Sequence, residues 1–150
     1  MKTKALLLLS AAAVLLRSPA SAADKISSAI LQKGSTSWDG GAFAYPQGQP
    51  EMTVQRITVK TDGKEVELPV HCHPVPIAGY VLKGSVKVVT SSAGKSRLFK
   101  AGEALIEVSN TWHKGIFAED TELLVFYAGK EGVPLSVKQV ESSFFASKCR

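Results

Sequence analysis

The sequence has no concentrated run of positive charge and no apolar run long enough to cross a membrane. Eighteen Lys and Arg against thirteen Asp and Glu give a formal charge of +5. Three of these cations lie within residues 1–22, so the remainder carries 5 − 3 = +2, and its lysines are scattered. We therefore do not expect a nucleic-acid partner. The apolar run at 5–16 has 12 residues, short of the roughly 20 of a spanning helix.

That apolar run fits a secretory signal peptide instead. Lys2 and Lys4 precede it, and a stretch of small residues ending in Ala20-x-Ala22 follows it, which is the pattern of a cleavable leader. We expect cleavage near Ala22, export to the periplasm or beyond, and no stable membrane anchor afterwards. No Cys stands at the cleavage point, so a lipid-anchored lipoprotein is not indicated.

Cysteine is scarce, with Cys72 and Cys149 as the two examples. An oxidising compartment permits a disulfide between them. The sequence does not establish the Cα separation that such a bond requires. A disulfide and two free thiols both remain open at this point.

Helix-forming periodicity is also scarce, and short strands dominate from residue 52 onward. Residues 52–59 alternate between polar and apolar types, as a half-buried strand does. Many short strands joined by Gly-containing turns predict one β-sandwich or closed barrel. Upstream, the spacing from Ile26 to Lys33 allows one or two helical turns ending at Gly34. The further strands are expected at 65–70, 77–82, 85–90, 96–99, 104–108, 111–117, 123–127 and 136–140.

The three histidines of the chain are the best guide to its function. His71 and His73 are spaced i, i+2, so on a strand they project from one face. His113 lies on another strand-like segment and can supply a third imidazole. Three neutral nitrogen donors with an open coordination position suit a catalytic divalent metal.

These histidines also carry a family resemblance. His71-x-His73 followed by the run 79–84 resembles the first conserved motif of the cupins, and Gly102-Glu103 followed by His113 resembles the second. The resemblance covers roughly residues 52–128 and implies an all-β, single-domain fold, the cupin-type jelly-roll β-barrel, with a metal in one mouth. The expected organisation is a signal peptide at 1–22, an N-terminal extension at 23–51, the barrel at 52–142 and a C-terminal tail at 143–150.

The departures from the family pattern matter as much as the match. Cupins usually supply a Glu four residues after the second His, and Ile77 holds that position here. In the second motif, Val108, Asn110 and Phe117 stand where the family has Pro, Gly and Asn. The resemblance therefore implies three His ligands without the acidic one, holding one divalent transition metal: Fe, Zn, Ni, Cu or Mn.

Glu107 is the candidate replacement for the missing acid. It follows Leu105 at a spacing of two, so both share one strand face, and Ile106 and Val108 share the other. If the face of Glu107 is the interior, its carboxylate is a fourth ligand, a partner for an imidazole N–H, or a general base. The alternative is an exposed Glu on the outer surface, where most glutamates lie.

Strand phase assigns further side chains to the interior. It places Ile77, Gly79 and Val81 on the His side, where Gly79 leaves room for a ligand to approach. It also directs either Gln55 or Arg56 inward. By the same phase Cys72 points out of the barrel.

The run 123–127 lacks alternation, which predicts burial of both strand faces. Either a terminal segment or a second subunit would cover the outer face, and the second case is the homodimer hypothesis. We expect a metal-binding cupin that acts on a small molecule by oxygenase-like or other metal-assisted chemistry, with Glu107 as an acid–base group. A non-catalytic metal- or ligand-binding module and a structural barrel with vestigial histidines are the alternatives, and the fold does not choose among them.

Overall fold

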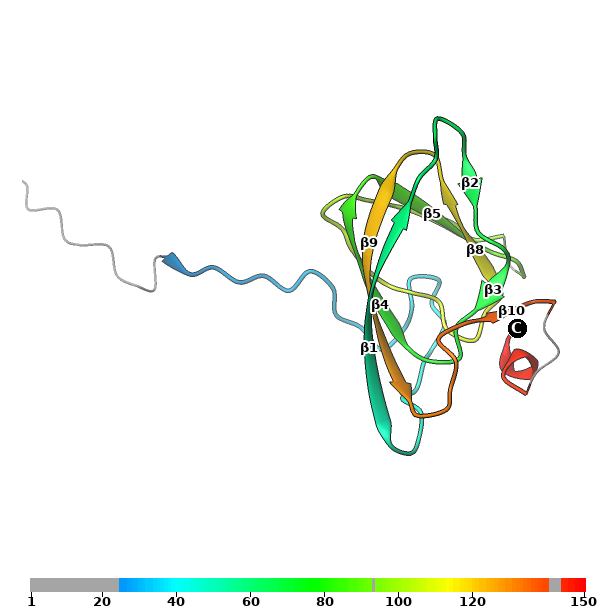
Figure 1. Ribbon diagram of the computed structural model, residues 1–150. Coiled ribbons are helices and arrows are strands. Elements are labelled where there is room, and N and C mark those ends of the chain that lie inside the picture. The colour runs from blue at the N-terminus through cyan, green and yellow to red at the C-terminus, as the bar shows by residue number, and fades with distance from the viewer. Residues whose placement is uncertain (1–24, 93, 141–143) are drawn as a thin grey trace, which may run out of the picture.

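The chain forms two antiparallel sheets that face each other across one core (Figure 1). The computed structural model describes residues 25–92, 94–140 and 144–150. One sheet has the order β1-β9-β4-β7, and the other has the order β10-β3-β8-β5-β6 with β2 also paired to β8. The strands are β1 (Pro50–Val59), β2 (Val66–Glu67), β3 (His71–Cys72), β4 (Ile77–Lys83), β5 (Ser85–Thr90), β6 (Ser96–Lys100), β7 (Ala104–Ile106), β8 (His113–Phe117), β9 (Thr121–Lys130) and β10 (Val137–Lys138).

This architecture confirms the predicted all-β, jelly-roll class. The C-terminal tail contains η2, a 3-10 helix at Ala146–Lys148. Within the part of the chain that the structure describes, no helix is both long and apolar enough to span a membrane. The predicted signal peptide at 1–22 lies outside the described residues.

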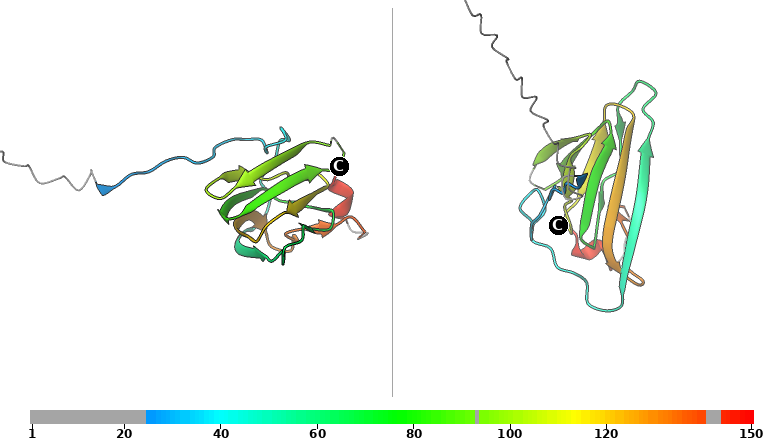
Figure 2. Two further views of the ribbon diagram at one scale, coloured as in Figure 1. Left: turned by 90° about the horizontal axis from the view of Figure 1, so that it is seen from above. Right: turned by 90° about the vertical axis from the view of Figure 1, so that its left-hand side faces the viewer.

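The helical turns expected before Gly34 are wrong. Residues 26–34 are extended and run away from the sandwich (Figures 1 and 2). Ile26 and Ile30 are almost fully exposed. Helices this short are marginal without an apolar face to bury, and these side chains have no such contact in the single chain.

The core lies between the sheets and follows strand alternation. On β9, Leu123, Val125 and Tyr127 are buried against the opposite sheet, whereas Phe126 on the other face is 39% exposed. In the single chain the run 123–127 is therefore fully buried on one face, not on both. The outer face of this run, where Phe126 lies, is partly exposed to solvent.

Candidate metal centre

The sheet formed by β3 and β8 brings the three histidines together. His71 on β3 pairs directly with His113 on β8, and His73 follows at the end of β3. The ring centroids lie 4.5 to 5.0 Å apart. One potential ligand atom from each residue lies within 4.8 Å of the other two. The structure thus assembles the predicted trio from two neighbouring strands.

A backbone carbonyl fixes the tautomer of each imidazole. The Nδ1 of His71 lies 2.8 Å from the Pro69 oxygen, that of His73 lies 2.7 Å from the Leu135 oxygen, and that of His113 lies 2.8 Å from the Thr111 oxygen. A carbonyl oxygen only accepts, so each Nδ1 carries the proton and donates it. Each Nε2 then keeps its lone pair, and the ring is oriented by the hydrogen bond on its other side.

Burial keeps the imidazoles uncharged. Removal from water lowers the pKa of His71, His73 and His113 from the ordinary value of 6.5, and the pKa of His73 falls furthest. The charge of a protonated His113 lowers the pKa of His71 and His73 further. The neutral form is the one that binds a metal ion, so the site is in its binding form at neutral pH.

The donor set fits one transition-metal ion. Two nitrogens bound to the same tetrahedral ion at about 2.1 Å are about 3.4 Å apart. The histidine nitrogens lie within 4.8 Å of one another, so the imidazoles have to move closer together when they bind one ion. Neutral imidazoles suit Zn, Cu, Fe and Ni, and the carbonyl contacts on Nδ1 are those that metal-binding histidines make.

The histidines border a cavity of about 290 Å³ between the two sheets. Ile77 lines it from β4, so an apolar side chain faces the interior at the position where the family has its Glu. Gly79 lines it as well, but the expected room beside it is absent. A Cβ on Gly79 would lie 2.8 Å from Leu105 Cδ2, which shows that the Leu105 side chain fills this space.

The structure places Glu107 on the cavity side with Leu105, not on the outer surface. Its Oε1 accepts hydrogen bonds from Trp38 Nε1 at 3.2 Å and from the Val108 amide at 3.0 Å. Burial raises the pKa of this carboxyl group, and the two hydrogen bonds partly oppose that rise. Among the described residues, none donates a hydrogen bond to Oε2.

Sequence reasoning missed Trp38. It lies in the N-terminal extension, where the Trp38 amide donates to the Ile106 oxygen at 3.1 Å and the ring packs edge-on against Phe99. A lone Trp in a polar loop was the one hint, because no strand or helix periodicity marks this segment. The contact nevertheless ties the extension to the candidate acid.

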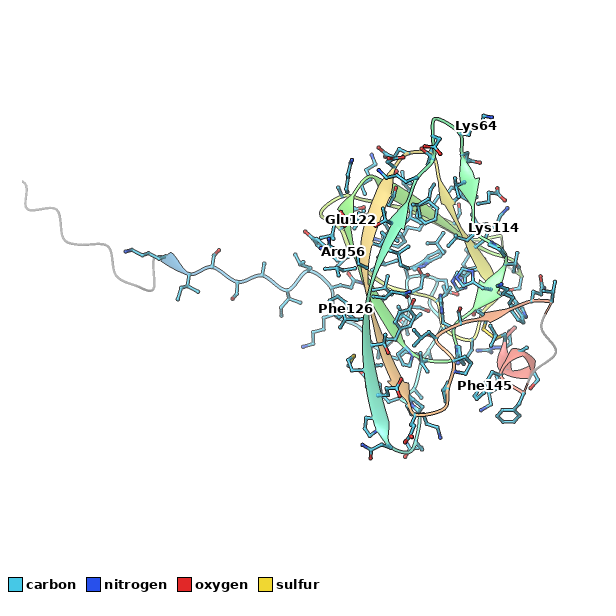
Figure 3. All side chains as sticks on the ribbon, in the orientation of Figure 1. Arg56, Lys64, Lys114, Glu122, Phe126 and Phe145 are labelled. Carbon is cyan, nitrogen blue, oxygen red and sulfur yellow. A yellow bond between two sulfur atoms is a disulfide. The ribbon has the colours of Figure 1, made fainter. Side chains whose placement is uncertain are left out.

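Gln55, not Arg56, is the inward residue of β1. Gln55 lines the cavity and accepts a hydrogen bond from the Tyr127 hydroxyl at 3.3 Å. Arg56 points outward and pairs with Glu122 at 3.1 Å (Figure 3). Arg56 is therefore not among the residues that line the cavity.

A disulfide between Cys72 and Cys149 resolves the alternative left open by the sequence. Cys72 is fully buried, on the side of β3 away from the cavity, as strand phase predicts. The chain end also joins β8: the Trp112 amide donates to the Arg150 oxygen, and the Arg150 amide donates to the Asn110 oxygen. The disulfide and these hydrogen bonds therefore attach the C-terminal tail to the two segments that carry the three histidines.

Asn110 connects the tail to the site. It occupies the second-motif Gly position and has a left-handed φ of 54°, a conformation that Asn tolerates better than most residues. Its amide donates to the His73 oxygen at 2.9 Å. The departure from the family pattern at this position is therefore compatible with the turn.

Comparisons with known proteins agree with this architecture. Residues 56–128 match the family model described as Cupin domain. A cupin-2 domain protein from Shewanella frigidimarina is similar over 51% of this chain and 70% of its own, at 15% identity and a TM-score of 0.43. Conserved protein SPY1581 from Streptococcus pyogenes is similar over 58% of this chain and 80% of its own, at 14% identity and a TM-score of 0.46.

An oxalate oxidase in complex with glycolate is similar over 58% of this chain, at 23% identity and a TM-score of 0.47, and this chain spans 45% of that protein. No match was found among curated proteins. With its two facing antiparallel sheets and its family match, the chain belongs to the cupin superfamily as a single-domain protein.

Proposed function

We propose that the protein binds one divalent transition-metal ion, Fe, Zn, Ni, Cu or Mn, through the Nε2 atoms of His71, His73 and His113. The observation that carries the proposal is the set of three Nδ1–H···O=C hydrogen bonds. Histidines that merely fill a core have no reason to direct all their free nitrogens to one point. Here the three ring centroids lie within 5.0 Å of one another, and the rings border a cavity.

With the ion held by these three histidines, the protein would act on a small molecule that enters the cavity, in oxygenase-like or other metal-assisted chemistry. An ion with only neutral protein ligands keeps its full positive charge toward the substrate and supplies Lewis acidity. Glu107 is the group proposed to hold or move the substrate proton at Oε2. Positioned acid–base groups of this kind contribute about 10²- to 10⁴-fold to rate.

A non-catalytic binding module remains the second candidate, because the same cavity can retain a ligand without converting it. Glu107 separates the two candidates. In a binding module its carboxylate would only accept a hydrogen bond from the ligand, whereas in a catalyst it would also take up the substrate proton. The vestigial-barrel alternative predicts no metal affinity at all.

Metal content tests the proposal first. Protein purified from its native compartment is expected to contain one equivalent of a transition metal, measured by elemental analysis. His71→Ala combined with His113→Ala should remove it. Lys114→Ala, next to His113 on β8, is the matched control and should retain it. Absence of metal from the wild-type protein, or retention of metal in the double variant, contradicts the proposal.

Turnover tests the catalytic candidate. Oxygen uptake is measured with small thiols, diketones and phenols on protein loaded with each of the five metals. Glu107→Gln is expected to lower any turnover by about 10²-fold or more while metal content stays unchanged. Metal-loaded protein without turnover favours the binding module.

Export to an oxidising compartment is proposed from the leader pattern at 1–22, and the Cys72–Cys149 disulfide supports it. A homodimer is proposed from the outer face of β1, β9 and β4, where Met52, Val54, Leu82 and Phe126 are exposed. Contiguous exposed apolar side chains mark interaction surfaces. Sedimentation of a strict monomer at micromolar concentration contradicts the dimer.

A further inference from the structure

The walls of the cavity are mostly apolar. Side chains from both sheets converge on it, and its volume of about 290 Å³ is at the low end of ligand pockets, about 300 Å³. A compact molecule with one ring fits such a space, and burial of its carbon atoms provides the attraction. The apolar lining residues are Ile57, Leu68, Ile77, Val86, Val88, Leu105, Phe117, Leu123 and Val125.

The charged groups around the cavity are few and unevenly placed. Among the described lining residues, Lys138 on β10 is the one cation and is exposed, and Glu107 is the one carboxylate. No arginine lines the cavity. A carboxylate of a buried ligand would therefore meet no cationic side chain inside, apart from the metal ion itself, and unpaired buried charge is costly.

Charge balance limits what the loaded site accepts. Three neutral imidazoles, one divalent ion and an ionised Glu107 sum to +1. A neutral ligand, or one that loses a single proton, leaves the site neutral or positive. A dicarboxylate leaves it at −1 within an apolar chamber, where solvent cannot compensate.

Glu107 provides one directional contact for the ligand. Its Oε1 is held by Trp38 and the Val108 amide, while Oε2 has no hydrogen-bond donor among the described residues. The residue retains accessible surface, and it borders the cavity. Oε2 is therefore an acceptor held in position for a donor that the protein itself does not supply.

We propose that the cavity binds an uncharged, compact and predominantly apolar molecule that donates one hydroxyl hydrogen to Glu107 Oε2, with phenols as the simplest members, and that it discriminates against dicarboxylates. The proposal rests on the proposed metal site, because Glu107 and the three histidines line the same cavity and the ligand would share it with the ion.

Calorimetry on the full chain tests the proposal in two stages. Zn²⁺ is titrated first, which tests the metal site alone. Phenol, anisole, benzoate and oxalate are then titrated into the Zn²⁺-loaded protein. Phenol is expected to bind at least about tenfold more tightly than anisole, which has the ring without the donor, and than oxalate. Equal or tighter binding of oxalate or anisole overturns the proposal.

Glu107→Gln isolates the directional contact. The Gln carbonyl can still accept from Trp38, which turns its NH₂ group toward the cavity, where it cannot accept from a hydroxyl. The preference for phenol over anisole should disappear in this variant. Glu103→Gln, an exposed acid of the same segment, is the control and should keep the preference. An unchanged preference in Glu107→Gln contradicts the proposal.

A measurement on the wild-type protein guards against a variant that fails to fold. Intermolecular NOEs are expected between the phenol ring protons and the methyl groups of Val88 and Leu123, which line the cavity from opposite sheets. Their absence at saturating phenol contradicts binding inside the cavity. If Zn²⁺ does not bind, the proposed metal site fails, and the phenol preference of the metal-free protein still decides the role of Glu107.

Discussion

The two sheets of this barrel contribute different chemistry to one cavity. The sheet containing β3 and β8 supplies all three imidazoles, and we call its inner face the polar wall. Backbone carbonyls just before these two strands, those of Pro69 and Thr111, fix the tautomers of His71 and His113. The facing sheet supplies mainly aliphatic side chains, including Ile77 at the position of the family acid, and we call its inner face the apolar wall. The exceptions are Gln55 on β1, Tyr127 on β9 and Glu107 just after β7. In the function proposed above, one wall would bind the ion and the other would select what approaches it.

Removal of one imidazole should have the largest effect on Zn²⁺ affinity. His113→Ala deletes a ligand at the centre of the polar wall, and we expect Zn²⁺ affinity to fall by at least about 100-fold, since even changes to groups that orient a ligand cost 10- to 100-fold. Leu123→Ala on the apolar wall is the counterpart, and its affinity should stay within a few-fold. Calorimetric titration measures both, and equal losses would show that the two walls do not differ in this way.

Loss of the disulfide should lower both the stability of the protein and its Zn²⁺ affinity. Cys149→Ser is expected to lower the free energy of unfolding by about 2–4 kcal/mol, because the bond closes a long loop of the unfolded chain. Zn²⁺ affinity should fall as well, since the tail contacts residues next to His73 and His113. Urea unfolding measures the first effect. Ser147→Ala in the same tail is the control, and matching midpoints for the two variants would exclude the bracing role.

Mild acid should act on the stability through the three histidines. The pKa values of the three histidines are lowered in the folded protein, so below pH 6.5 the unfolded chain takes up more protons. The stability of the metal-free protein therefore falls as the pH drops below 6.5, by up to about 1.4 kcal/mol per pH unit for each such imidazole.

The raised pKa of Glu107 acts in the opposite direction as the pH rises above 4.5, its ordinary value. The measurement is therefore made in the Glu107→Gln background, by urea unfolding at a series of pH values. A flat profile between pH 6.5 and 5 would contradict buried, neutral imidazoles.

Placing the missing acid on the apolar wall should raise Zn²⁺ affinity and lower the stability of the metal-free protein. Ile77→Glu adds a carboxylate at the family position, and we expect Zn²⁺ affinity to rise by about tenfold, about 1.4 kcal/mol. Without metal the variant should melt at a lower temperature than the wild type, because a buried acid has lost its hydration. Ile77→Gln is the neutral control. An affinity no higher than that of Ile77→Gln would show that β4 does not face the ion.

Strand alternation accounts for what the sequence predicted well. The period-two pattern placed β1, β4 and β5 within a few residues, and the phase of His71 and His73 predicted their shared face. The same phase placed Glu107 beside Leu105 and turned Cys72 outward. These features depend on local geometry, which a period of two records directly.

Contacts between distant segments were not readable in the same way. The Trp38–Glu107 hydrogen bond joins residues 69 positions apart, and the disulfide closes over 77. The room expected beside Gly79 was filled by Leu105, whose register against β4 the sequence does not record. Helical spacing before Gly34 misled because helix formation there lacked a surface to pack against.

The assignment of Nε2 as the ligand atom on all three histidines is the central claim, and long-range ¹H–¹⁵N NMR of the imidazoles tests it most directly. In the metal-free protein each ring should show a protonated Nδ1 and an unprotonated Nε2. One equivalent of Zn²⁺ should shift all three Nε2 resonances together, with each Nδ1 keeping its proton. A shift at Nδ1, or a ring that Zn²⁺ leaves unchanged, would contradict the three-histidine site.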